Sequence, residues 1–107
     1  MTVARVELRD ENDPQSVEIA VTGEIDLSNA DQVRNELYEA IANDLMQVSV
    51  NLTGVSYLDS SGLRVLFMLA ERLQRLQTEL AIVAPPGTPA RRIVELAGFD
   101  AVATLRP

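Results

Sequence analysis

Hydrophobic and polar residues alternate along this chain at two spacings, and the spacing separates strands from helices. Apolar side chains recur at every second position in residues 3–10 and 16–22, which predicts two β-strands. The second run places its apolar side chains on one face: Val17, Ile19 and Val21. The polar stretch ENDP at 11–14 is typical of a turn, so we expect the two strands to pair antiparallel.

The first helical spacing follows these strands. Ser28, with Asp31 three positions further on, resembles a capping box with Asp in place of the usual Glu, and it predicts a helix start. The apolar positions of this helix then repeat every three or four residues: Ala30, Val33, Leu37 and Ile41.

Two more helices are expected nearer the C-terminus. One begins in the stretch YLDSSGL at 57–63, and its apolar stripe consists of Leu63, Leu66, Phe67, Ala70 and Leu73. The other lies in 87–99, with Thr88 as its N-cap, Pro89 as its first residue and Gly98 as its C-terminal stop.

Three short apolar runs separate and follow these helices. They lie at 48–52, 79–86 and 101–107, and each predicts a strand. The resulting order is ββαβαβαβ. A strand, a helix and a strand in succession favour a right-handed crossover and parallel pairing. We therefore expect one α/β domain over residues 1–107, with a mixed sheet packed by helices.

Composition and charge narrow the class of partner. The formal net charge is −7, which argues against nucleic-acid binding, because that needs a basic surface. Acidity permits a basic protein partner, or it serves only to keep a small protein in solution. No apolar run approaches the roughly 20 residues of a membrane span, and the first residues are too polar for a signal peptide. With no cysteine in the chain, we expect a cytoplasmic protein without membrane contact.

Missing residue types argue against an enzyme. The chain has no histidine and no cysteine, so it can build neither a Ser-His-Asp triad nor a zinc site of the usual kind. Its basic residues are all arginines, which are poor general bases. A nucleophilic Ser60 or Ser61 would therefore lack a base other than a carboxylate. We expect no catalysis, no cofactor and no metal.

The pair of serines in YLDSSGL supports two interpretations. Asp59, Ser60 and Ser61 all favour the start of a helix, where backbone N–H groups lack partners. An ordinary capped helix accounts for one serine but poorly for two. A helix N-terminus also suits a covalently attached phosphate, which makes a serine there a candidate phosphoacceptor. Gly62 would either relieve crowding or let a partner's backbone approach.

Three segments of the chain carry a resemblance to a known family. They are VTGEIDLSNADQVRNEL at 21–37, VNLTGVSYLDSSGLRVL at 50–66 and PPGTPARRIVELAGFD at 85–100. The first is similar to a family segment G-E-[LI]-D, and the second contains the signature D-S-[ST]-G-[LIV]. On these motifs the chain resembles the STAS domain family, and within it the bacterial anti-sigma-factor antagonists. The resemblance covers nearly the whole chain.

The resemblance implies a regulatory mechanism called partner switching. The unmodified protein would bind an anti-sigma factor that is also a serine kinase with a GHKL-type ATPase fold, and the sigma factor would be freed for transcription. The kinase would phosphorylate the first serine of the signature, here Ser60, and so abolish binding. A PP2C-type phosphatase would reset the switch.

The resemblance also implies which residues meet the partner. They are Glu24, Asp26, Asp59, Ser61, Gly62 and Leu63, around the phosphorylation site Ser60. Asp26 has a local alternative, which is to cap the helix beginning near Ser28. Val65 and Met68 are left open between core and contact surface. At the level of function, the alternative is a STAS scaffold or ligand-sensing module that is never phosphorylated.

Overall fold

A computed structural model describes residues 2–9, 13–42 and 44–107 of the chain. Its elements are β1 (Ala4–Arg9), β2 (Ser16–Ile25), α1 (Ala30–Ala40), β3 (Gln47–Leu58), α2 (Ser60–Arg75), β4 (Glu79–Val83), α3 (Pro89–Leu96), the short 3₁₀ helix η1 (Phe99–Ala101) and β5 (Thr104–Arg106). Their order confirms the predicted ββαβαβαβ succession, to which η1 is an addition. The turn predicted at 11–14 lies partly outside the described residues.

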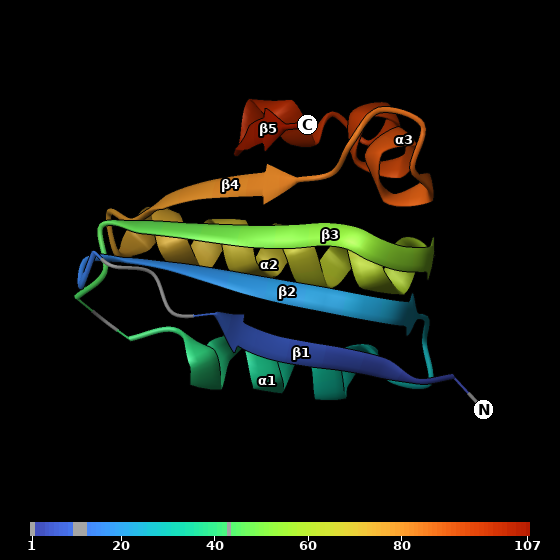
Figure 1. Cartoon of the computed structure of the whole chain (residues 1–107), viewed down its shortest axis with the longest axis horizontal. Helices are drawn as coiled ribbons and strands as arrows, with labels where there is room; N and C mark the ends of the chain where they lie inside the picture. Colours follow the sequence, from blue (N-terminus) through green and yellow to red (C-terminus); the bar gives the residue numbers. More distant parts are fainter. Residues whose placement is uncertain (1, 10–12, 43) are drawn as a thin grey trace.

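The strands form a mixed sheet in the order β1-β2-β3-β4-β5. β1 pairs antiparallel with β2, and the other neighbours pair in parallel. α1 and α2 lie behind the sheet in the view of Figure 1, so both cover the same face. Because β2 and β3 are parallel neighbours, their carboxyl ends meet at one pole of the sheet, where the loops to α1 and α2 begin.

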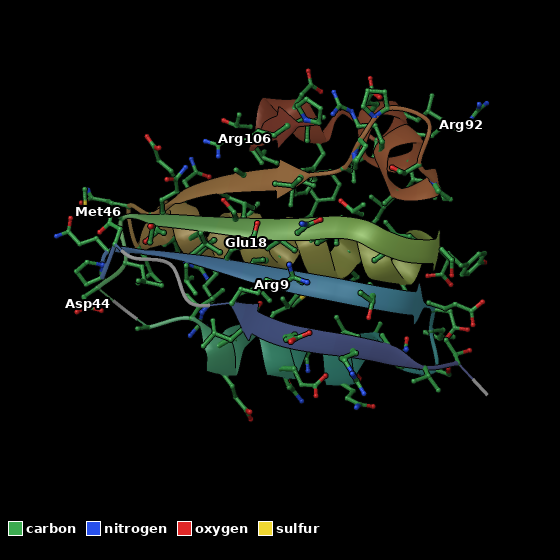
Figure 2. All side chains as sticks on the ribbon, viewed as in Figure 1. Arg9, Glu18, Asp44, Met46, Arg92 and Arg106 are labelled. Atoms are coloured by element: carbon green, nitrogen blue, oxygen red, sulfur yellow. The ribbon has the colours of Figure 1, made fainter. Side chains whose placement is uncertain are left out.

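The core lies between this sheet and the helices. Ile19 and Val21 of β2 are buried, as their alternation predicts. At the C-terminal side, Phe67 of α2 meets Phe99 of η1 edge to face, with ring centroids 4.8 Å apart, and this contact joins η1 to the main core. The opposite sheet face carries polar side chains: Arg9 and Glu18 are directly opposite each other in the register of β1 and β2 (Figure 2).

The capping box predicted for the first helix is wrong. α1 begins at Ala30 and its N-cap is Asn29, which makes no side-chain capping hydrogen bond. The hydroxyl of Ser28 instead donates to the carboxylate of Asp26. A competing local hydrogen bond has therefore taken the side chain that the sequence pattern assigned to the cap.

Two further differences concern lengths and faces. β3 extends through Leu58, well past the predicted 48–52, because residues 54–58 continue to pair with β2 after register shifts. Those shifts break the period of two that the prediction relied on. In α2, Val65 is buried, whereas the predicted stripe residues Leu63 and Phe67 are only partly buried against the core. The end signals of α3 are confirmed: Thr88 caps it, Pro89 opens it and Gly98 follows it in a left-handed conformation.

Candidate functional site

The pole where β2 and β3 end brings two separate sequence motifs together. Ile25 and Leu58 are opposite each other in the parallel register, and the N–H of Asp59 donates to the carbonyl of Ile25 at 3.3 Å. Asp26 and Asp59 therefore follow neighbouring strands at the same edge of the sheet. This proximity is what the resemblance implied for the two motifs.

The structure shows which residue caps the start of α2. Asp59 is the N-cap, and its Oδ1 accepts hydrogen bonds from the N–H groups of Ser61 at 2.9 Å and of Gly62 at 3.2 Å. Neither serine is needed for capping, because the carboxylate already satisfies these donors. Ser60 is the first helical residue and is exposed, whereas Ser61 is half-buried. The Ser60 hydroxyl takes part in no hydrogen bond found among residues 2–9, 13–42 and 44–107.

Asp26 holds the turn between β2 and α1. Its carboxylate accepts hydrogen bonds from the hydroxyl of Ser28 at 2.5 Å, from the hydroxyl of Thr2 at 2.6 Å and from the N–H of Ser28 at 2.8 Å. The hydrogen bond from the Ser28 hydroxyl, followed by that from Thr2, lowers the pKa of Asp26 below its usual range. The carboxylate therefore stays ionised at neutral pH.

A buried amide supports the same turn. Asn29 donates from Nδ2 to the carbonyl of Glu24 at 2.9 Å and accepts at Oδ1 from the N–H of Asp26 at 3.0 Å. The side chain thus joins the end of β2 to the start of α1. The carboxylate of Asp26 does not cap α1, as the local alternative had it, but accepts from the N–H of Ser28 inside the turn. The backbone carbonyl of Asp26 accepts from the N–H of Ala30, the first residue of the helix.

The remaining expected site residues differ in accessibility. Glu24 is exposed near the end of β2, and Leu63 is half-buried against the core. Gly62 is buried, and a Cβ added there would collide with Leu58 and crowd Ile25. Of the two roles considered for Gly62, the structure therefore supports relief of crowding inside the protein, where this residue is buried.

A groove between α1 and α2 adjoins the serines. Its volume is about 240 Å³, and it is lined by Leu27, Ala30, Asp31, Arg34, Ser61, Arg64, Val65 and Met68. Leu27 stands 83% exposed at its edge, and Met68 is half-buried in its wall. Sequence reasoning did not find this groove, because its lining comes from two helices whose relative placement is set by packing. The i, i+3, i+4, i+7 spacing of residues 61, 64, 65 and 68 was the available signal.

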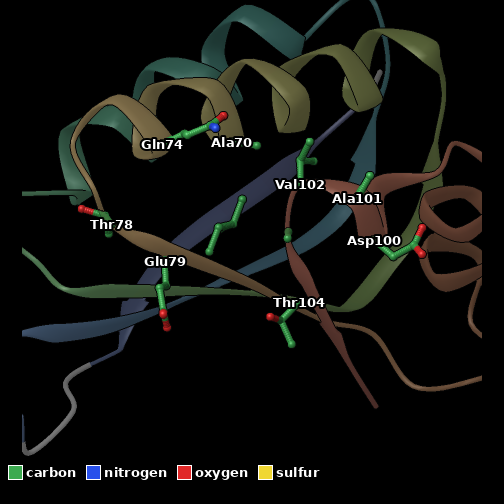
Figure 3. A pocket seen from close by; sticks show the side chains of 10 residues that line it. Ala70, Gln74, Thr78, Glu79, Asp100, Ala101, Val102 and Thr104 are labelled. Carbon is green, nitrogen blue, oxygen red and sulfur yellow. The ribbon is translucent and has the colours of Figure 1, made fainter.

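A second hollow lies at the other end of α2. It measures about 480 Å³ between α2, β4 and the segment leading into β5 (Figure 3). Glu79 and Asp100 are its charged lining residues, and the Thr78 hydroxyl already donates to the carbonyl of Leu45 at 2.8 Å. Within the described part of the chain, no three acidic, histidine or cysteine side chains gather as metal ligands. None of the helices described is both long and apolar enough to cross a membrane.

Comparison with known proteins relates this geometry to a family. The anti-sigma-B factor antagonist of Listeria monocytogenes is 35% identical over 72 residues, which are 67% of this chain and 63% of that protein. The matched part is thus slightly less than two thirds of that relative's length. A solved anti-sigma factor antagonist from Mycobacterium paratuberculosis superposes with a TM-score of 0.84 at 25% identity, covering 98% of this chain and 86% of that one.

A third comparison concerns the fold alone. The anti-sigma factor antagonist SpoIIAA in its unphosphorylated form superposes with a TM-score of 0.73 at 20% identity, over 96% of this chain and 89% of that one. SpoIIAA of Bacillus in its phosphorylated form superposes with a TM-score of 0.69 at 19% identity, over 96% of this chain and 92% of that one.

The family model for the STAS domain matches residues 7–107, and the chain therefore belongs to the STAS domain family.

Proposed function

We propose that this protein is an anti-sigma factor antagonist that works by partner switching. In its unmodified form it binds an anti-sigma factor that is also a serine kinase with a GHKL-type ATPase fold, and the sigma factor is released. The proposal is supported by the names of the relatives at 35% and 25% identity, both anti-sigma factor antagonists. The protein is then a binding partner and a substrate, and it acts as a regulator of transcription in the cytoplasm.

The observation that carries the proposal is the division of labour at the start of α2. Asp59 caps the helix, which leaves the exposed Ser60 hydroxyl without a structural task. A kinase can transfer the γ-phosphoryl group of ATP to this oxygen: the bond to ADP breaks, the new P–O bond forms and the hydroxyl proton leaves to a base of the kinase. Ser61 faces the groove between the helices and is the less accessible of the two.

Phosphorylation would change the surface and leave the fold in place. The phosphate adds about −1.5 to −2 charges at neutral pH. It arrives beside the carboxylates of Asp26 and Asp59, on a face that also holds Glu24. The cap on α2 does not involve Ser60, so the helix keeps its start. A hydroxyl that fitted an interface becomes a bulky dianion, which is enough to break a complex. A PP2C-type phosphatase restores the hydroxyl.

Kinase-dependent labelling tests the proposal. The protein is incubated with ATP and the anti-sigma kinase encoded near it, and phosphorylated protein is separated by Phos-tag electrophoresis. We expect labelling of the parent and of Ser61→Ala, and none of Ser60→Ala. Labelling of Ser60→Ala with loss in Ser61→Ala would reverse the assignment. A parent protein that neither binds nor is labelled by this kinase would favour the unphosphorylated scaffold instead.

A further inference from the structure

Arg64 places a positive charge one helical turn after Ser60 on α2. Residues four apart in a helix are neighbours on its surface, and long helical side chains lean toward the N-terminus. Arg64 is exposed, lines the groove between α1 and α2, and takes part in no ion pair or hydrogen bond found in the described part of the chain. Its guanidinium is therefore free to reach a group attached to Ser60.

The other arginine of the groove is already engaged. Arg34 lies across the groove on α1, with a guanidinium nitrogen 3.5 Å from the carboxylate of Asp31. The same side chain also donates to Oδ1 of Asn35, at 3.3 and 3.4 Å. A new anion at the start of α2 would have to break these contacts to recruit Arg34, whereas Arg64 has no such contact with the residues that the structure describes.

We propose that Arg64 binds the phosphoryl group of phosphorylated Ser60 and acts as its intramolecular partner. The proposal rests on the phosphorylation of Ser60 proposed above. A planar guanidinium matches the oxygens of a phosphate with two parallel hydrogen bonds. The order along the helix is also the favourable one, since an anion four positions before a cation stabilises a helix more than the reverse.

This contact makes phosphorylation change the pole in two ways. In the unmodified protein Arg64 belongs to the wall of the groove and is available to a carboxylate of the partner. In the phosphorylated protein its guanidinium turns to the phosphate on its own helix. The partner therefore meets a new anion and loses a cation that was open to it before. The net charge changes only by that of the phosphate, but the hydrogen-bond donors of Arg64 are no longer available to the partner.

The test measures the second pKa of the phosphate itself. Phosphoserine is incorporated at position 60 of the full chain during translation, so no kinase is required, and ³¹P NMR follows its titration between pH 4 and 8. A nearby cation favours the dianion and lowers this pKa, so Arg64→Gln should raise it. We expect a rise of about 0.1 to 0.4 units, from the size of surface pairs in helices.

Matched variants make the outcome specific. Arg75→Gln removes the same charge from the same helix, roughly 20 Å from Ser60, and should leave the phosphate pKa unchanged. Arg64→Lys keeps a positive charge but lacks the planar guanidinium that forms two parallel hydrogen bonds. The phosphate pKa of this variant should lie between those of the parent and of Arg64→Gln. Circular dichroism checks that each variant is folded.

Two results would overturn the proposal. One is an unchanged phosphate pKa in a folded Arg64→Gln protein. The other is a rise in Arg34→Gln without one in Arg64→Gln, which would place the phosphate against α1. Neither result touches the proposed function, which fails only if the kinase does not bind the protein or label Ser60.

Discussion

At the scale of single residues, each residue at the start of α2 has its own role. Asp59 caps the helix, so Ser60 is free. Gly62 has no side chain, so α2 can approach Leu58 and Ile25 closely. Redundant polar residues in the sequence thus have separate tasks. The sequence suggested the helix start and the phosphoacceptor, but it did not show that an acid, and neither serine, supplies the cap.

Asp26 gives a pH-dependent prediction at this scale. Its pKa is lowered in the folded state by the hydroxyls of Ser28 and Thr2, so it contributes stability that is present above its ordinary pKa of about 3.9. That contribution is lost as the pH falls through the lowered, folded-state value. We expect Asp26→Asn to be less stable than the parent at pH 7, with a difference that shrinks below about pH 4.

Urea unfolding at pH 7 and at pH 3 measures this difference. Asp44→Asn, at an exposed position, is the control and should follow the parent at both pH values. If the unfolding free energies of Asp26→Asn and of the parent differed by the same amount at both pH values, the hydrogen bonds to Asp26 would contribute no pH-dependent stability.

At the scale of elements, what sequence reasoning could predict depended on how local each signal was. α3 carries its own start and stop, and both were predicted correctly from Thr88, Pro89 and Gly98. The capping box was wrong because the hydroxyl of Ser28 has a better acceptor in Asp26. The end of β3 and the groove were missed for another reason: register shifts and the packing of α1 on α2 are tertiary events, which leave no simple period in the sequence.

The cap of α2 provides the prediction at this scale. Asp59→Ala removes the acceptor of two backbone hydrogen bonds and should cost about 1 kcal/mol of unfolding free energy. Asp59→Asn keeps an oxygen in the same place and should lose much less, because asparagine is nearly as good an N-cap. Urea unfolding monitored by circular dichroism compares the two variants. Equal losses in both would show that the charge of Asp59 matters more than its hydrogen bonds.

At the scale of the whole molecule, the surface charge at the start of α2 can change without a change of the fold. The chain carries a formal net charge of −7, and its sheet keeps one face covered by α1 and α2. The start of α2 is exposed, so a negative charge added there would stay outside the core. The regulation by phosphate that we propose would therefore require no rearrangement of the sheet or of the helices that cover it.

Ser60→Asp tests this separation. An acid at a helix N-terminus is tolerated and gains a few tenths to about 1 kcal/mol, so the melting temperature should stay the same or rise slightly. Binding to the anti-sigma factor, measured by isothermal titration calorimetry, should weaken, because the interface must accommodate a charge. Ser60→Asn has the same shape without the charge and is the matched control. The electrostatic switch would be wrong if Ser60→Asp bound as tightly as the parent.

The hydrogen bond from Thr2 to Asp26 has a consequence for how the protein can be joined to other chains. It fastens the beginning of β1 to the same pole that presents Ser60. A domain or an affinity tag attached ahead of Thr2 would therefore be joined at the same end of the sheet as the serine that we propose as the phosphoacceptor.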